Sequence, residues 1–283
     1  MKTSNKLLII FMLLMFIIPL AIMAYTINRD YKNPNEIKAQ ENANAHFNIP
    51  SIGFTSIGLK KAFKSINVVD EKDKFWYINL VNDISYGVKV SEAYKDFVLI
   101  NVDESGKLRI TLKGDTKKVI YPIVLYVYSP KIEELNLDGV DAVTLKFKNY
   151  KDKLQLNVKD VSQLNLREDF RVSDLSIHAE RVNDLVLAGE EIKLLNLDLK
   201  SSYFRSEMRS FASLNISASD GSRLNFSGND RQANEFSIDS LILNTSGKVD
   251  VDLANIKLNN ISGSLSNETM INVPVGYLKQ MIK

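Results

Sequence analysis

Five polar residues recur at one spacing and are the main candidates for chemistry in this sequence: Asp138, Asn157, His178, Asp198 and Ser217. Each lies three residues after a leucine that opens an apolar-polar-apolar triplet. If the triplets stack strand beside strand, His178 lies one strand from Asn157 and one from Asp198. An acid–imidazole pair then forms, with a histidine that can transfer protons near neutral pH. The alternative is an exposed polar ladder in which the carboxylate only pairs with the imidazole.

Few other residues offer catalytic or metal-binding chemistry. The sequence has no cysteine, and His46 is the only histidine besides His178. The absence of cysteine excludes disulfides and thiolate nucleophiles. With only two histidines, one of them in the polar N-terminal region, the sequence offers almost no residues for a multi-histidine metal site or a Ser-His triad. Aspartates are frequent between the triplets, but the Gly-rich calcium-binding repeat is absent, so turn chemistry explains them better. We predict no catalytic residue, no metal and no cofactor, and hence a protein that is not an enzyme.

The triplets themselves repeat at a nearly constant interval. They begin at Leu135, Leu154, Leu175, Leu195 and Leu214, so the steps are 19, 21, 20 and 19 residues. A second apolar series, at Leu145, Leu164, Leu185, Phe204 and Leu224, has similar steps. Because side chains alternate along a strand, both apolar residues of a triplet face one side. A fixed period near 20 residues predicts stacked repeats, and we expect an all-β parallel β-helix, or solenoid.

The composition of the N-terminal segment predicts a helix, in contrast to the strands predicted for the rest of the chain. Lys2 and Lys6 precede an uncharged apolar run from Leu7 to Ala24. About 18 residues at roughly 1.5 Å each approach the thickness of the hydrocarbon layer. We therefore predict a transmembrane signal-anchor helix with the rest of the chain on the non-cytoplasmic side. Ile22-Met23-Ala24 is an alternative cleavage site, which would make the protein secreted or periplasmic.

The rest of the chain divides by composition. Residues 1–25 are the predicted signal-anchor helix, and residues 26–48 are a polar tether. Residues 49–130 contain short alternating runs that predict a β-rich N-terminal part and an irregular β cap of the solenoid. Residues 131–283 contain the repeats and a C-terminal cap. Trp76 and its aromatic neighbours could stack on sugar rings, but the alternation favours a place in the core.

Several of these segments, in this order and spacing, resemble the auto-transporter adhesin, head GIN domain family of bacterial envelope proteins. The resemblance covers about residues 60–275. It rests on the segments 63–66, 86–90, 98–112, 124–130, 132–139, 214–228 and 256–264. It implies a parallel β-helix, export with a signal or anchor, and no established activity.

Charge and composition limit the function classes. Basic and acidic residues nearly cancel, with a net charge of +2, so the chain has no strong field to recruit nucleic acid. We expect a non-catalytic, membrane-anchored envelope protein with a binding, adhesive or structural role. Its expected partners are the membrane, through the N-terminal helix, and an envelope protein or polysaccharide. The alternatives are a carbohydrate-active enzyme and, less favoured, an envelope sensor; the oligomeric state is left open.

Overall fold

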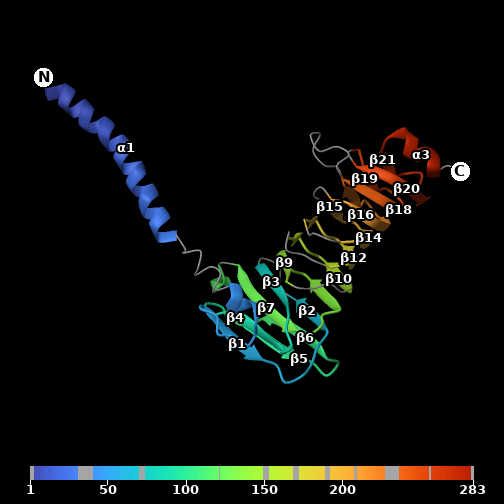
Figure 1. The fold of residues 1–283 in the computed structure, drawn as a ribbon, viewed down its shortest axis with the longest axis horizontal. Coiled ribbons are helices and arrows are strands. Elements are labelled where there is room, and N and C mark those ends of the chain that lie inside the picture. Colours follow the sequence, from blue (N-terminus) through green and yellow to red (C-terminus); the bar gives the residue numbers. More distant parts are fainter. Residues whose placement is uncertain are drawn as a thin grey trace. The chain divides into compact units, whose positions relative to one another are not determined.

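A computed structural model describes residues 3–30, 41–69, 74–120, 122–148, 153–167, 172–188, 192–206, 209–226, 236–254 and 256–281. The chain forms two compact units, Met1–Asn42 and Ala43–Lys283. The first unit contains the helix α1 (Thr3–Asp30) and the second contains all the strands (Figure 1).

A helix forms where the apolar N-terminal run predicts one. Across the stretch from Phe11 to Tyr25 its side chains are exposed. Even so, the described residues contain no helix with both the length and the apolar character needed to cross a bilayer. This finding corrects the prediction of a transmembrane helix.

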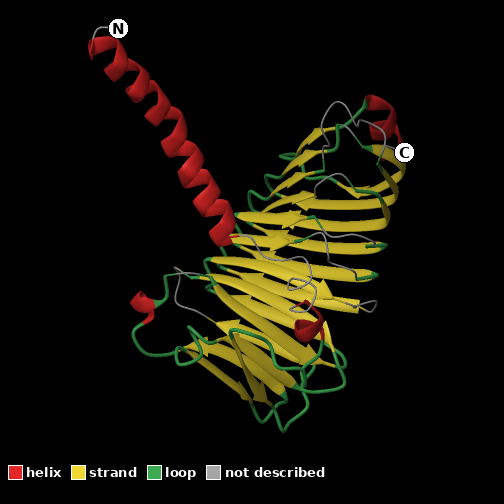
Figure 2. Ribbon diagram, turned by 60° about the vertical axis from the view of Figure 1, so that its left-hand side comes forward, coloured by secondary structure: helices red, strands yellow, loops and turns green. Residues whose placement is uncertain are grey.

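The second unit is built from two large sheets (Figure 2). The 11-stranded sheet contains, in spatial order, β1 (Phe54–Gly58), β4 (Gly87–Ser91), β7 (Ile123–Ser129), β3 (Phe75–Asn82), β9 (Ala142–Lys148), β11 (Gln163–Leu166), β13 (Asp184–Leu187), β15 (Tyr203–Ser206), β17 (Arg223–Asn225), β19 (Asp250–Asp252) and β21 (Met270–Asn272).

The 10-stranded sheet contains β20 (Lys257–Ser264), β18 (Ser237–Ser246), β16 (Phe211–Ser219), β14 (Leu194–Lys200), β12 (Asp174–Glu180), β10 (Lys153–Lys159), β8 (Glu134–Asp138), β2 (Ser65–Val69), β6 (Lys107–Leu112) and β5 (Val98–Val102). A short 3-10 helix, η1 (Thr116–Lys118), precedes β7, and α3 (Val275–Met281) packs against the edge strand β20.

The prediction of a parallel β-helix is wrong. The strands form two separate sheets, and both are mixed: β4 pairs antiparallel with β1 and β7, and β5 pairs antiparallel with β6. From β8 onward the chain alternates between the sheets, so the period near 20 residues represents one strand in each sheet. The sequence period therefore reflects the alternation of the chain between two sheets. It cannot show whether the strands close into a solenoid.

The apolar triplets supply the core, as their alternation predicts. In the 10-stranded sheet Leu175 pairs with Leu154 on one side and with Leu195 on the other, and Leu195 pairs with Leu214. All four are buried, and inward side chains of both sheets belong to one apolar cluster. Each fully buried aliphatic side chain contributes roughly 1.5–3 kcal/mol, so this cluster is the main source of stability. Trp76 is 1% exposed and belongs to the core, as predicted, but its neighbours Phe75 and Tyr77 are exposed, so the prediction of a core position is wrong for them.

One register differs from the expected one. Leu135 pairs with Leu156 instead of Leu154, and in the other sheet Leu145 pairs with Leu166 instead of Leu164. A shift of two residues keeps every side chain on its own face, so alternation cannot detect it. The pairing with β2, where Ile66 and Val68 oppose Leu135 and Leu137, accompanies the observed register.

Residues 43–51, most of which the sequence analysis assigns to the tether, pack against the outer side of β4 and β7. The fully buried Lys89 donates from Nζ to the carbonyl oxygens of Ala43, His46 and Ile49 and to Ser51 Oγ, over 2.7–2.8 Å. Its Nζ also lies 5.2 Å from the ring centroid of Tyr128. Burial lowers the pKa of Lys89, although the charge of Asp83 partly offsets this effect. We call residues 43–51 the docked segment.

Candidate functional site

The main candidate site is a groove on the outer face of the 10-stranded sheet, with a volume of about 470 Å³. Outward side chains of β8, β10, β12, β14 and β16 line it. They are Asn136, Asp138, Asn157, Lys159, His178, Glu180, Asp198, Lys200 and Ser219. The remaining lining residues, Leu137, Val158 and Ala179, are buried members of the core. The groove is therefore a polar surface laid over an apolar floor.

Two rows of side chains run across these strands, and all of their members except Ser217 line the groove. The amide row contains Asn136, Asn157, His178, Asp198 and Ser217, each paired in register with the next. The charged row contains Asp138, Lys159, Glu180, Lys200 and Ser219 in the same way. Neighbouring strands lie about 4.8 Å apart, so both rows repeat at that interval. Opposite charges alternate along the second row.

The predicted site residues are largely brought together. Asn157, His178, Asp198 and Ser217 occupy successive strands of one row, as the triplet spacing predicts. Asp138 is the exception, because the two-residue register shift at β8 places it opposite Lys159. Asn136 takes the expected place of Asp138. Ser217 continues the row but does not line the groove.

The predicted acid–imidazole pair is present. His178 Nδ1 lies 3.2 Å from Asp198 Oδ2, and the two side chains are 51% and 63% exposed. Exposed ion pairs of this kind contribute about 0–1 kcal/mol, because water screens them. The pair orients the imidazole at the surface and leaves it open to a ligand.

Amide hydrogen bonds order the other end of the amide row. Asn157 Nδ2 donates to Asn136 Oδ1 over 2.7 Å and to Glu134 Oε1 over 3.0 Å. Asn136 Nδ2 in turn donates to Asn67 Oδ1 over 2.7 Å. These amides link the three neighbouring strands β10, β8 and β2, and each holds its neighbour in one orientation. A preordered row of this kind loses little side-chain entropy when it binds a ligand.

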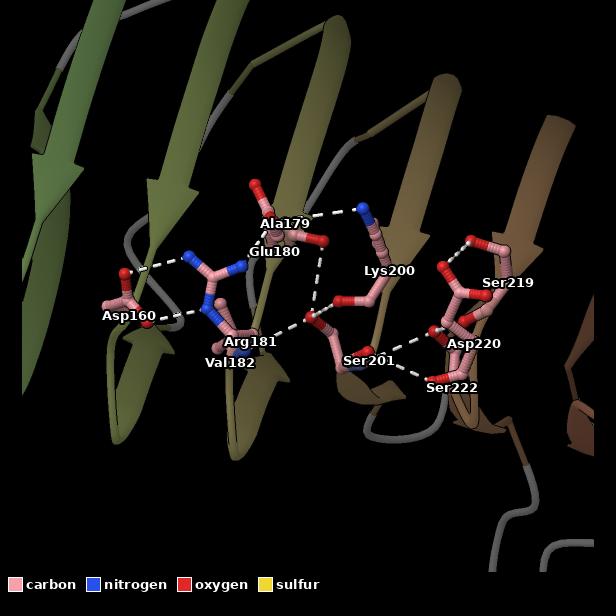
Figure 3. A network of polar contacts seen from close by, with 11 residues as sticks. Asp160, Ala179, Glu180, Arg181, Val182, Lys200, Ser201, Ser219, Asp220 and Ser222 are labelled. Atoms are coloured by element: carbon pink, nitrogen blue, oxygen red, sulfur yellow. Dashed lines mark hydrogen bonds and ion pairs between the residues drawn. The ribbon is translucent and has the colours of Figure 1, made fainter.

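A charged network borders the groove where the strands end (Figure 3). Arg181 donates from Nε and Nη2 to the two carboxylate oxygens of Asp160 over 2.7 and 2.9 Å, and also pairs with Glu180. Glu180 Oε1 lies 3.9 Å from Lys200 Nζ. The hydrogen bond with Asp160, followed by that with Glu180, raises the pKa of the Arg181 guanidinium, so its charge is permanent. The border is thus a chain of alternating charges across the three strands β10, β12 and β14.

The turns beneath this network have an uncommon backbone. Asp160, Arg181, Ser201 and Asp220 all have φ between 50° and 56°. Glycine, asparagine and aspartate tolerate this region best, so Arg181 and Ser201 need support. It comes from the next strand, because Arg181 N donates to Lys200 O over 2.9 Å and Ser201 N donates to Ser219 O over 3.3 Å. The stacked strands therefore hold the charged side chains at fixed positions.

Sequence reasoning missed the charged row. Lys159, Glu180 and Lys200 each lie five residues after the first leucine of their triplet, so the same spacing would have found them. Asn136 lies only one residue after its leucine, so the triplet spacing alone does not place it in the amide row, and the register shift at β8 brings it opposite Asn157. The described residues contain no group of three or more His, Cys, Asp or Glu side chains placed to hold a metal ion.

The fold and the groove define a mostly β protein with two large mixed sheets and a polar groove on the outer face of one of them. No known family profile matches the sequence, and no curated protein matches it. Solved structures that show some similarity to this chain include a "putative adhesin" from Bacteroides fragilis, with 12% identity over 79% of this chain and 94% of that chain and a TM-score of 0.44. A "putative adhesin" from Parabacteroides distasonis has 16% identity over 78% and 92%, with a TM-score of 0.45.

A "putative lipid binding protein" from Parabacteroides distasonis is also similar, with 13% identity over 78% of this chain and 93% of that chain and a TM-score of 0.40. Likenesses at this level carry no conclusion about function. The head GIN family therefore stays a prediction from the sequence.

Proposed function

We propose that this protein is a non-catalytic binding protein whose groove receives an extended polar ligand, for which a polysaccharide is the best chemical match. The observation that carries the proposal is the pair of in-register polar rows in the groove, one of amides with the His178–Asp198 pair and one of alternating charges. A polysaccharide repeats along its length, and its hydroxyl groups both donate and accept hydrogen bonds. Side chains that repeat from strand to strand suit such a ligand.

Catalysis is not part of this proposal. Glu180 and Asp198 line the same groove beside Lys200, so two acids do come together here. A carboxyl group that acts as a general acid, however, needs a pKa raised by burial. The side chains of Asp198 and Glu180 are 63% and 38% exposed, which favours contact with a ligand over proton transfer.

The test is binding of the full-length protein to an array of bacterial envelope polysaccharides. We expect the wild type to bind at least one, and the double variant H178A/K200E to bind about tenfold or more weakly through the loss of two contacts. The matched control is K257A, because Lys257 is exposed on β20 outside the groove. Equal binding by H178A/K200E and K257A would contradict the proposal. If the full-length protein bound an envelope protein and no glycan, the proposed ligand class would be wrong.

Export to the bacterial cell envelope is a further part of the proposal. Its support is the sequence of the N-terminal segment, in which two lysines precede a long apolar run. Fractionation of cells that express the full chain tests this expectation, with recovery in the envelope or secreted fraction as the expected result. Recovery with the cytoplasmic proteins would contradict it.

A further inference from the structure

A second pocket, separate from the groove, lies on the outer face of the 11-stranded sheet near its C-terminal edge. It has a volume of about 470 Å³, within the range of roughly 300–1,000 Å³ that small-ligand sites occupy. Residues of β15, β17, β19 and β21 line it. They are Tyr203, Arg223, Leu224, Asn225, Asp250, Val251, Asp252, Met270, Ile271 and Asn272. We call it the C-terminal pocket.

Strand pairing arranges its outward side chains in two short rows. Tyr203, Arg223, Asp250 and Met270 oppose one another on successive strands, as do Asn225, Asp252 and Asn272. Met270 is 58% exposed, and the guanidinium carbon of Arg223 lies 5.2 Å from the ring centroid of Tyr203. The pocket therefore has an apolar contact at one end, an aromatic ring at the other, and polar groups between them.

The two carboxylates of the pocket, Asp250 and Asp252, differ in their hydrogen bonding. Asp252 Oδ1 accepts from Ala254 N over 3.1 Å and from Asn272 Nδ2 over 3.2 Å, so the protein itself holds this carboxylate. Asp250 Oδ1, in contrast, is buried and has no hydrogen-bond partner among the residues that the structure describes. A buried acceptor without a donor costs about 1–3 kcal/mol. A ligand that donates a hydrogen bond at this point recovers that cost.

The charges around Asp250 restrict the ligand. A free cation is disfavoured because Arg223 lies directly opposite Asp250 on the next strand. An anion is disfavoured by the two carboxylates. A neutral donor with several hydroxyl groups fits the acceptors Asp250, Asn225 and Asn272, and a pyranose ring also has an apolar face for Met270. We propose that the C-terminal pocket is a binding site for a neutral sugar unit, independent of the groove.

Saturation-transfer NMR on the full-length protein tests this site, with the methyl pyranosides of glucose, galactose, mannose and N-acetylglucosamine as probes. We expect at least one probe to receive saturation from the wild type. D250N should weaken its binding about tenfold, as the loss of one hydrogen bond to a charged group predicts. M270E is the second variant: its side chain is exposed, so the fold should tolerate it, and its carboxylate should block the apolar contact.

The control variant is H178A, which alters only the groove. Unchanged sugar binding by H178A supports a separate site. The proposal is overturned if no probe binds to the wild type, or if D250N and M270E both bind as the wild type does. It is also overturned if H178A alone abolishes binding, a result that places the sugar in the groove and supports the proposed function instead.

Discussion

The protein uses a lysine in two opposite ways, at Lys89 and at Lys200. Lys89 is fully buried, and four oxygen atoms of residues 43–51 surround its ammonium group. The side chain of Lys200 is 57% exposed and has a long contact of 3.9 Å with Glu180. The first arrangement holds two segments together, and the second leaves a charge free to meet a ligand. Burial therefore separates the structural charges of this molecule from those suited to binding.

The docked segment shows what the buried arrangement requires. Tyr128 donates its hydroxyl to Asn44 O over 2.8 Å, and burial raises its pKa, so it stays protonated and able to donate. Phe47 lies over Gly87, where a Cβ atom would come within 2.2 Å of the ring. Phe47 N also donates to Asp83 Oδ2 over 3.1 Å. Each contact depends on another, which is typical of a buried polar network.

The largest expected effect follows from K89M. This change removes the ammonium group and leaves part-buried carbonyl oxygens of the docked segment and the buried Ser51 hydroxyl without their donor. An unsatisfied buried group costs about 1–3 kcal/mol, so for several groups together we expect a loss of about 3–5 kcal/mol in unfolding free energy, or release of residues 43–51 at a smaller cost. Urea unfolding measures the first outcome and limited proteolysis the second. K257M, at an exposed lysine, is the control, and equal behaviour of the two variants would show that burial is not the distinction.

A pH-dependent effect is expected from Asp83. Burial raises the pKa of this carboxyl group, but hydrogen bonds from Ser85 and Phe47 together outweigh burial, so its pKa lies below 3.8. A lowered pKa stabilises the fold above the unfolded value and loses that effect as pH falls through the folded value. D83N should therefore cost about 1.5–3 kcal/mol at pH 7 and progressively less below about pH 4. A difference from wild type that does not change with pH would refute this account.

Gly87 gives a smaller and more local test. G87A forces the ring of Phe47 to move, and we expect a cost of about 1–3 kcal/mol. G58A is a matched control, because a Cβ atom at Gly58 would lie 3.8 Å from the same ring, an ordinary contact. In the background of F47A, G87A should cost much less. Additive costs in this double-mutant cycle would contradict the proposed contact.

The smallest effect on stability is expected in the groove. H178A and D198A should each change the unfolding free energy by less than about 1 kcal/mol, because their pair is exposed. Polysaccharide binding by the same variants should fall clearly if the groove is the site. Chemical denaturation and glycan binding, measured on the same variants, test whether the exposed groove charges serve binding while the buried charges serve stability. A large loss of stability in H178A would place this pair with the structural charges instead.

Much of the site was predictable because it follows the triplet spacing. The row of Asn157, His178, Asp198 and Ser217 and the contact between His178 and Asp198 both follow from strands that repeat in register. Asp138 was misplaced, because a shift of two residues preserves the apolar face. The Lys89 network carried no sequence signal, since it joins residues about 40 positions apart through carbonyl oxygens, which any residue type supplies.

The sequence by itself determined the strands of the repeat, the inward face of each triplet and the core position of Trp76, because alternation and burial are local properties of a strand. Only the tertiary structure decided that the strands form two separate mixed sheets, which register β8 adopts, and which charged groups are buried. These features depend on pairing between distant strands and on the docked segment. The free energies that select them arise from contacts that no local pattern encodes.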